Sequence, residues 1–225
     1  MRSEDNIYTQ DPILINENNF NVYDGRYIYS KRTKKRTKPF IYRYAGFDMG
    51  RSQDRSVLSL IDECQDGKYR LIGLYKMRNV DFFIQLYRLN FLCRSCEVDK
   101  LFYDANALGG KILTDGIHSI NQETGNVSYP YIANIAEPVP MNKPLKHSLY
   151  NGLKVLMQKK QLYLYSDRDM INEFKNLVHK ENGKIQAGTR TYNDDIPASI
   201  TLCIKEIVDK MGCECNDDSV DAYFL

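Results

Sequence analysis

The chain has 225 residues, of which 43% are hydrophobic and 27% are charged, a composition typical of a globular protein with one sizeable core. Its formal net charge of +2 excludes nucleic-acid binding driven by overall charge, so any such binding must depend on local basic patches. No apolar run approaches the length of a membrane span, and the first residues lack the apolar segment of a signal peptide.

Residues 1–40 are predicted to form an arm or linker, because they are rich in Asn, Asp, Glu and Tyr and show no sustained hydrophobic period. Residues 23–30 could add a short edge strand. The arm ends in a basic run before Pro39, whose cationic residues are Lys31, Arg32, Lys34, Lys35, Arg36 and Lys38. Such a run is commonly a solvated segment, and an arm that contacts DNA phosphates is the sharper alternative.

An antiparallel meander of three strands is predicted to begin the folded domain, which we assign to residues 41–212. The strands are predicted over residues 42–48, 56–63 and 68–78. Asp66-Gly67 is a turn signal between the second and the third.

The first of these strands ends in Asp48, which lies between Gly46 and Gly50. The missing side chains of the two glycines would let another backbone, a metal ion or a phosphate come close. An ionised Asp at the end of a buried strand needs compensation for its charge. A bound cation would supply it, and hydrogen bonds within a turn are the alternative.

A helix is predicted over residues 82–96, with Asp81 as its cap and apolar residues at helical spacing. Cys93 and Cys96 lie in this apolar run, which favours two buried helix positions and, with six cysteines in all, a reducing compartment. A four-cysteine zinc site with Cys213 and Cys215 is the alternative.

The next strand, residues 100–104, again ends in a carboxylate, that of Asp104. The elements predicted after it are a helix over 111–120, a strand around 131–135, a helix over 143–159, extended chain over 161–165, a helix from Asp167 to His179, a strand near 184–188, a helix over 195–211 that Gly212 ends, and an acidic tail over 213–225. Lys143, Lys146, Lys159 and Lys160 are expected to form a solvated face that is compatible with contact to a DNA backbone.

This order of elements predicts where two of the carboxylates meet. A meander followed by a helical crossover usually places the fourth strand parallel to the first and beside it. The carboxyl ends of the two strands then share one edge of the sheet, where sites form in open α/β folds. Asp48 and Asp104 end these strands, and like charges at one place favour a hard divalent cation such as Mg2+ or Mn2+.

A third carboxylate is expected in the segment Asn193-Asp194-Asp195-Ile196-Pro197. One of its polar residues is predicted to cap the last helix, with Pro in the first turn. Capping explains one acidic residue and not two in succession. One aspartate is therefore expected to serve another purpose.

Three segments together resemble the nuclease domain of bacteriophage terminase large subunits. They are residues 45–60, which begin Ala-Gly-Phe-Asp-Met-Gly, residues 102–110, which begin Phe-Tyr-Asp-Ala-Asn, and residues 193–200, which begin Asn-Asp-Asp-Ile-Pro. The resemblance spans residues 42–211 and implies a ribonuclease-H-like mixed sheet, an antiparallel meander plus parallel strands flanked by helices.

The resemblance also implies an activity, metal-dependent cleavage of double-stranded, concatemeric viral DNA during genome packaging by two-metal-ion hydrolysis. By position, Asp48 and Asp104 match the first two catalytic aspartates, which would bind two Mg2+ or Mn2+ ions. The third falls on Asp194 or Asp195; we favour Asp195, with Asp194 as an adjacent ligand or cap and Asp54 in a supporting role. The implied partners are DNA, the terminase ATPase domain, the small terminase subunit and the portal protein, with no membrane. The implied location is the host cell cytoplasm, outside the mature virion.

Two departures from the family pattern bear on this interpretation. No Gly-x-x-x-x-Gly-Lys-Ser/Thr loop occurs, so the ATPase half is absent and the chain is either a separate nuclease or an excised domain. Ala198-Ser199 replaces an Asp-Ala pair common in the last motif.

Two other functions remain open. The segment from Gly46 to Gly50 followed by a hairpin also resembles the phosphate loop of actin-like ATPases and sugar kinases. A nuclease-like module that binds DNA without cleaving it is the other alternative.

Overall fold

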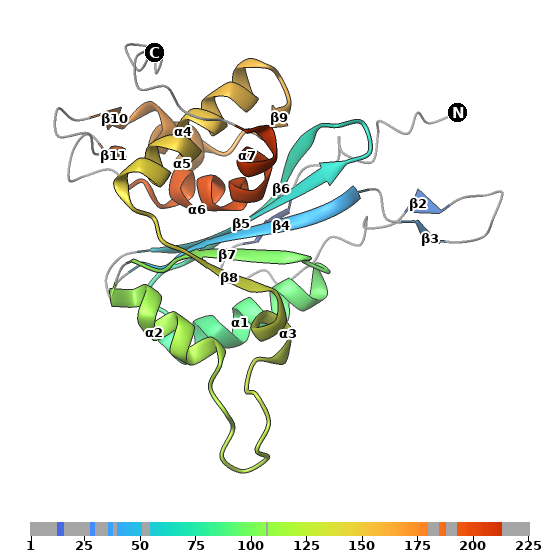
Figure 1. The fold of residues 1–225 in the computed structure, drawn as a ribbon, viewed down its shortest axis with the longest axis vertical. Helices are drawn as coiled ribbons and strands as arrows, with labels where there is room; N and C mark the ends of the chain where they lie inside the picture. Colours follow the sequence, from blue (N-terminus) through green and yellow to red (C-terminus); the bar gives the residue numbers. More distant parts are fainter. Residues whose placement is uncertain are drawn as a thin grey trace.

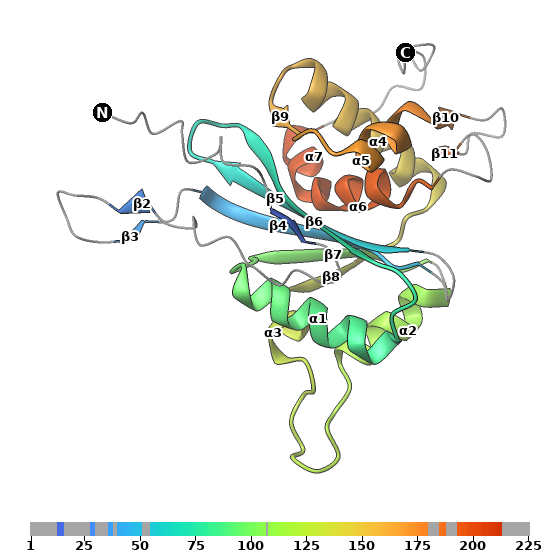
Figure 2. The same cartoon turned by 180° about the vertical axis from the view of Figure 1, so that it is seen from behind.

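A mixed β-sheet separates two layers of helices in the computed structural model (Figures 1 and 2). The structure describes residues 13–15, 28–29, 36–37, 40–50, 55–106, 108–179, 185–187 and 193–212. The helices α1, α2 and α3 lie on one side of the sheet, and α4 to α7 lie on the other (Figure 1). None of the helices in these ranges is long and apolar enough to cross a membrane.

The centre of the sheet is an antiparallel meander, as predicted. Its strands are β4 (Phe40–Asp48), β5 (Ser56–Cys64) and β6 (Tyr69–Met77). Gly67 makes the turn between β5 and β6 at a φ of 71°, a left-handed conformation that suits glycine. The large side chains of Tyr44, Phe47 and Tyr75 on these strands are fully buried, because helices cover both faces of the sheet.

Parallel strands extend the sheet beyond β4. The strand β7 (Lys100–Asp104) pairs parallel with β4, and β8 (Ala136–Val139) pairs parallel with β7. The seven-stranded sheet has the order β1-β6-β5-β4-β7-β8, with β9 on β6 as well. The predicted fold class, a mixed sheet of an antiparallel meander plus parallel strands, is confirmed.

The other elements complete the two faces and edges. The helices are α1 (Phe82–Ser95), α2 (Leu108–Ile117), α3 (Pro130–Ile135), α4 (Lys143–Gln158), α5 (Arg168–Lys175), α6 (Asp195–Cys203) and α7 (Lys205–Met211). The remaining strands are β1 (Ile13–Ile15), β2 (Ile28–Tyr29), β3 (Arg36–Thr37), β9 (Leu162–Tyr163), β10 (Leu177–His179) and β11 (Ile185–Ala187). Asp81 caps α1 as predicted, since its carboxylate accepts the Phe83 N–H at 2.9 Å.

Residues 131–135 are a helix, so the strand predicted there is wrong. Pro130 suits the first turn of a helix, and the Asn90 side chain accepts the N–H groups of Tyr131 and Ile132 at 3.0 and 3.2 Å. A side chain of α1 thus satisfies amides that a strand would have given to a neighbour. A short apolar run does not distinguish helix from strand, and here the tertiary contact decides.

Two helix ends also differ from prediction. The helix expected to reach His179 ends at Lys175, because Leu177–His179 pairs with β11 as a strand. The last helix divides at Ile204 into α6 and α7. The division is local, since the Val208 N–H still donates to the Ile204 carbonyl at 2.9 Å. Gly212 ends α7 as predicted, with a φ of 60°.

Gly46 lets α6 pack directly on the central strand. A Cβ at this position would lie 2.0 Å from the Ser199 carbonyl oxygen and 2.5 Å from the Cys203 nitrogen. The Cys203 thiol also lies 3.2 Å from the Tyr44 carbonyl oxygen. This contact places the start of α6 near the carboxyl end of β4.

Candidate metal centre

Asp48 and Asp104 end neighbouring parallel strands at the same edge of the sheet. Phe47 of β4 is paired with Tyr103 of β7, so the residue that follows each is an aspartate. Asp104 is also paired with Val139 of β8, so β7 is an internal strand of the sheet. The predicted topology is therefore present, and it brings the two strand ends together.

Asp194 and Asp195 stand at the start of α6, and neither side chain is used to cap it. Asp194 occupies the cap position but its side chain makes no capping hydrogen bond. Glu173 of α5 takes that role, because its Oε2 accepts the Ile196 N–H at 2.9 Å. Asp194 is therefore the N-cap residue, as expected for this segment, but a residue from another helix satisfies the amide in place of the Asp194 side chain.

The four carboxylates share one electrostatic environment. Burial raises the pKa of Asp48 well above its usual range, and repulsion from Asp195, Asp194 and Asp104 raises this pKa further. The ammonium group of Lys146 on α4 opposes these effects. Asp48 is thus held where its ionised form is costly.

The pKa of Asp104 is raised less than that of Asp48. Burial raises the pKa of Asp104, while the Asn106 N–H, which donates to its Oδ1 at 2.8 Å, and Lys146 lower it. Lys146 is half-buried, and its ammonium group lowers the pKa of both strand-end carboxylates. Lys143, Lys159 and Lys160 are exposed.

The four aspartates offer oxygen ligands that suit a hard divalent cation, although their carboxylates do not converge on a single position. Carboxylate oxygens are the ligands that Mg2+ and Mn2+ prefer, and mutual repulsion at Asp48 is what a cation would relieve. Among the described residues, no three His, Cys, Asp or Glu side chains are close enough to hold an ion as they stand. Side-chain rotations that bring these carboxylates together would therefore be needed for several of them to hold one ion.

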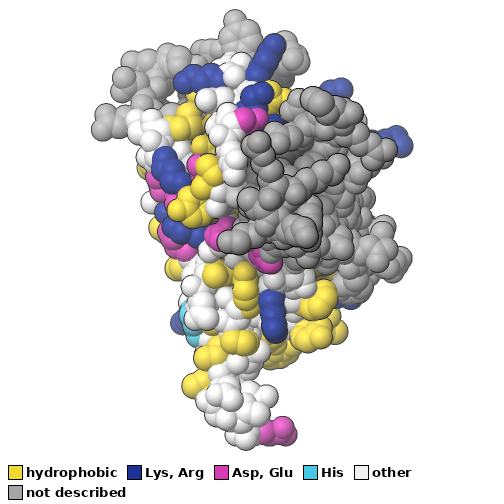
Figure 3. Space-filling model, turned by 90° about the vertical axis from the view of Figure 1, so that its right-hand side faces the viewer, with side chains coloured by type: hydrophobic (Ala, Val, Ile, Leu, Met, Phe, Trp, Pro, Cys, Tyr) yellow, Lys and Arg dark blue, Asp and Glu magenta, His cyan; other side chains and the backbone are white. Residues whose placement is uncertain are grey.

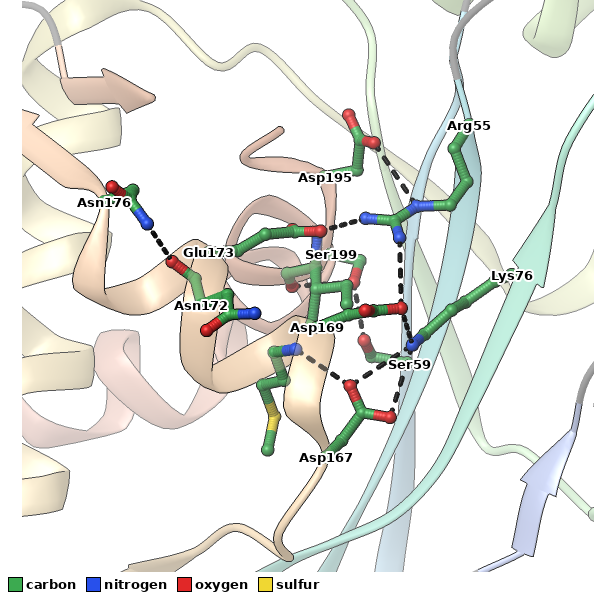
Figure 4. A network of polar contacts seen from close by, with 12 residues as sticks. Arg55, Ser59, Lys76, Asp167, Asp169, Asn172, Glu173, Asn176, Asp195 and Ser199 are labelled. Carbon is green, nitrogen blue, oxygen red and sulfur yellow. Dashed lines mark hydrogen bonds and ion pairs between the residues drawn. The ribbon is translucent and has the colours of Figure 1, made fainter. Parts of the chain in front are cut away.

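A network of ion pairs beside Asp195 was not predicted from the sequence (Figure 4). Arg55, which precedes β5, contacts Glu173, and its Nε lies 3.5 Å from Asp195 Oδ2. Lys76 of β6 lies 2.8 Å from Asp169, which also faces Arg55 at 3.8 Å. Single charged residues at these positions form no motif, so no signal in the sequence alone identifies them.

Ser199, one of the residues that replaces the family's Asp-Ala pair, is structural here. Its hydroxyl lies 2.6 Å from the Ser59 hydroxyl and 2.9 Å from the Ile196 carbonyl, inside the core. This contact joins α6 to β5.

Several predicted residues lie outside the part of the chain that the structure describes. These are Asp54, the basic residues Lys31, Arg32, Lys34, Lys35 and Lys38, and the cysteines Cys213 and Cys215. Arg36 is described only as part of strand β3. Cys93 and Cys96 are buried, as predicted.

The fold is similar to that of known large terminase nucleases. The large terminase nuclease from thermophilic phage G20c has 23% sequence identity and a TM-score of 0.56, with 73% of this chain and 82% of that chain covered. A structure of the same nuclease with bound magnesium has 23% identity and a TM-score of 0.56, covering 72% and 79%. The large terminase of bacteriophage HK97 has 12% identity and a TM-score of 0.50, with 73% of this chain and 39% of that chain covered.

No protein-family model and no curated protein sequence matches this chain. The likeness is therefore one of structure, at low sequence identity. The three structures are terminase proteins and lend no support to the actin-like alternative. With its meander, its parallel strands and its paired strand-end aspartates, the chain has the ribonuclease-H-like fold of a large terminase nuclease domain.

Proposed function

We propose that this chain is a divalent-metal-dependent endonuclease that hydrolyses phosphodiester bonds of double-stranded DNA. The observation that carries the proposal is the meeting of Asp48 and Asp104 at adjacent strand ends, with two further carboxylates at the start of α6. The fold of terminase nucleases, one of which has been observed with bound magnesium, supports it.

Asp48, Asp104 and Asp195 would hold the ions, with Asp194 as an adjacent ligand. Asp48 lies within electrostatic reach of all three other carboxylates, so it would hold the metal together with them. Bound Mg2+ or Mn2+ would supply an activated water and stabilise the departing 3′ oxygen. No side chain of this group needs to act as a covalent nucleophile. The Lys146 ammonium is placed to balance the negative charge that substrate phosphates bring.

We place this activity in the packaging of concatemeric viral DNA, on the likeness to large terminases. The chain covers most of the G20c nuclease and 39% of the HK97 large terminase chain, so partners that complete the machinery are expected. They are a terminase ATPase domain, a small terminase subunit and a portal protein, in the host cell cytoplasm. The basic run from Lys31 to Lys38 would add contacts to DNA phosphates.

The proposal is tested by nicking of supercoiled plasmid with Mn2+, with Mn2+ plus EDTA, and with the Asp48→Asn variant. We expect nicking by the native chain with Mn2+ only, and none by the variant, because a neutral amide is a poor ligand for a hard cation. A variant with native circular dichroism that nicks at the native rate would remove Asp48 from the mechanism.

A DNA-binding module without catalysis is the second candidate, favoured by the open spacing of the carboxylates. It predicts a mobility shift of DNA with Mn2+ but no nicking at any metal concentration. The same plasmid experiment therefore separates the two functions.

A further inference from the structure

We propose that Arg55, held in place by Glu173, is a positioning residue that orients the carboxylate of Asp195 for metal binding. The inference rests on the proposed function, in which Asp195 is the third ligand. It goes beyond that function because neither Arg55 nor Glu173 is one of the four aspartates proposed to hold the metal ions.

Arg55 presents three different nitrogens to three carboxylates (Figure 4). Its Nη2 donates to Glu173 Oε1, its Nε lies 3.5 Å from Asp195 Oδ2, and its Nη1 lies 3.8 Å from Asp169 Oδ2. The side chains of Arg55 and Glu173 are only 9% and 7% exposed. A rigid, planar guanidinium in such a buried position defines the direction from which it meets a carboxylate.

Glu173 connects this guanidinium to the backbone of α6. Its Oε1 accepts from Arg55, while its Oε2 accepts the Ile196 N–H at 2.9 Å. One carboxylate therefore holds both the residue that faces the Asp195 side chain and the peptide group that follows Asp195. The side chain and the backbone of the third ligand are set by the same contact.

The other half of the network fixes Glu173 relative to the sheet. Lys76 of β6 lies 2.8 Å from Asp169 and 3.2 Å from Asp167. Asp167 also caps α5, since its Oδ1 accepts the Met170 N–H at 2.8 Å. The helix that carries Glu173 is thereby anchored to the strand next to β5. Lys76 has no contact with Asp195 among its ion pairs, which makes it a matched comparison for Arg55.

Repulsion explains why Asp195 needs such support. Asp48 and Asp195 interact unfavourably, so an Asp195 side chain without an opposing cation would turn away from the strand ends. Arg55 lies against one oxygen of Asp195 and offsets its charge before an ion binds. Groups that orient metal ligands in this way typically change metal affinity by about 10- to 100-fold.

The test is calorimetric titration of Mn2+ into the metal-free chain, which reports affinity independently of cleavage. We expect the dissociation constant to rise about 10- to 100-fold in Arg55→Met and less in Arg55→Lys, which keeps the charge but not the planar fork. Lys76→Met loosens the anchor of α5 but removes no contact to Asp195, so it should lower the melting temperature and raise the Mn2+ dissociation constant less than Arg55→Met does. Mn2+ binding by Arg55→Met that equals or exceeds native binding would overturn the inference, since the arginine would then be purely structural or a competitor of the ion.

If Arg55→Met does not fold, the decision passes to Arg55→Lys, for which weaker Mn2+ binding supports the inference and native binding overturns it. Failure of the proposed function is distinguishable from failure of the inference. A native chain that binds no Mn2+, or an Asp48→Asn variant that binds it normally, overturns both. Loss of binding in Asp48→Asn together with native binding in Arg55→Met overturns the inference alone.

Discussion

The two ends of the central strands β4 and β7 carry opposite arrangements of charge. Near the amino ends of these strands, two cationic side chains each meet an opposite charge. Arg43 forms a two-point ion pair with Asp62 at 2.5 and 2.7 Å, and Lys100 pairs with Glu206. The side of the molecule on which β4 begins shows acidic and basic side chains next to one another (Figure 3).

At the carboxyl ends, like charges gather instead. Asp48 faces repulsion from Asp104, Asp194 and Asp195, with Lys146 as the opposing cation. Paired charges in the first region partly offset the cost of each other's burial, whereas crowded carboxylates in the second repel one another. Perturbed acids cluster at functional sites, and a bound cation, as proposed above, would offset this repulsion.

The largest expected effect comes from comparing two aspartates at opposite ends of β7. Asp104→Asn should reduce Mn2+-dependent plasmid nicking on the order of 10^4-fold, because it removes a candidate ligand. Asp99→Asn should retain cleavage, because Asp99 accepts the Arg43 N–H at 2.7 Å near the other end and an amide oxygen can replace it. Initial rates at saturating Mn2+ measure both. Equal losses in the two variants would contradict the division of roles between the strand ends.

The next largest effect is on the stability of the fold, through the ion pair near the amino end of β4. Arg43→Met leaves the buried Asp62 without its partner and should lower the free energy of unfolding by about 3–5 kcal/mol. The double replacement Arg43→Met with Asp62→Leu should recover much of this loss, because no unpaired charge remains. Urea denaturation measures the differences. A single variant as stable as the native chain would show that the pair contributes nothing.

The aspartates at the carboxyl ends of β4 and β7 should make the metal-free protein less stable as the pH rises. The folded-state pKa values of Asp48 and Asp104 are raised, so the folded chain binds protons more tightly than the unfolded chain. The free energy of unfolding therefore falls as the pH rises from about 4, the ordinary Asp value, through the raised values. Melting temperatures between pH 4 and 8 measure this slope.

Asp62 and Glu173 also have raised pKa values and contribute in the same direction, so a variant is needed to isolate the site. Asp48→Asn should show a shallower decline than the native chain. Parallel curves for the two proteins would mean that Asp48 does not titrate as its surroundings imply.

A smaller effect is expected where α6 meets β4. Gly46→Ala should cost about 1–3 kcal/mol, because the new methyl group would meet the backbone of Ser199 and Cys203. It should also reduce Mn2+ affinity by displacing the start of α6. Gly73→Ala is the matched control, since its Cβ would meet only the Leu60 side chain, at 3.4 Å. Thermal unfolding and Mn2+ titration of both variants check the prediction, which fails if they behave alike.

The smallest effect is expected for a partly exposed ion pair near the amino end of β4. Lys210 is 44% exposed and lies 3.4 Å from Glu63 and 2.9 Å from the Tyr44 hydroxyl. Lys210→Met should lower the free energy of unfolding by about 0–1 kcal/mol. The difference should shrink in 1 M salt, where screening weakens exposed pairs. Denaturation at low and high salt measures it, and a loss above this range at both would show a role in packing.

The sequence by itself determined the central elements and the meeting of two carboxylates. Apolar and aromatic runs bounded by turn signals predict β4, β5 and β6, and a side-chain cap predicts the start of α1. The rule that a helical crossover after a meander returns beside the first strand places β7 next to β4. From these, the adjacency of Asp48 and Asp104 follows without coordinates. Each inference depends on interactions that are local or on a general rule of chain topology.

Only the tertiary structure decided what surrounds the third carboxylate. Arg55 and Glu173 are 118 positions apart in the sequence, and neither has neighbours that indicate its partner. The same holds for Asn90, which turns residues 130–135 into a helix from a distance of 41 positions. Hydrogen bonds and ion pairs between remote segments depend on where packing brings each side chain, and that packing is a property of the whole fold.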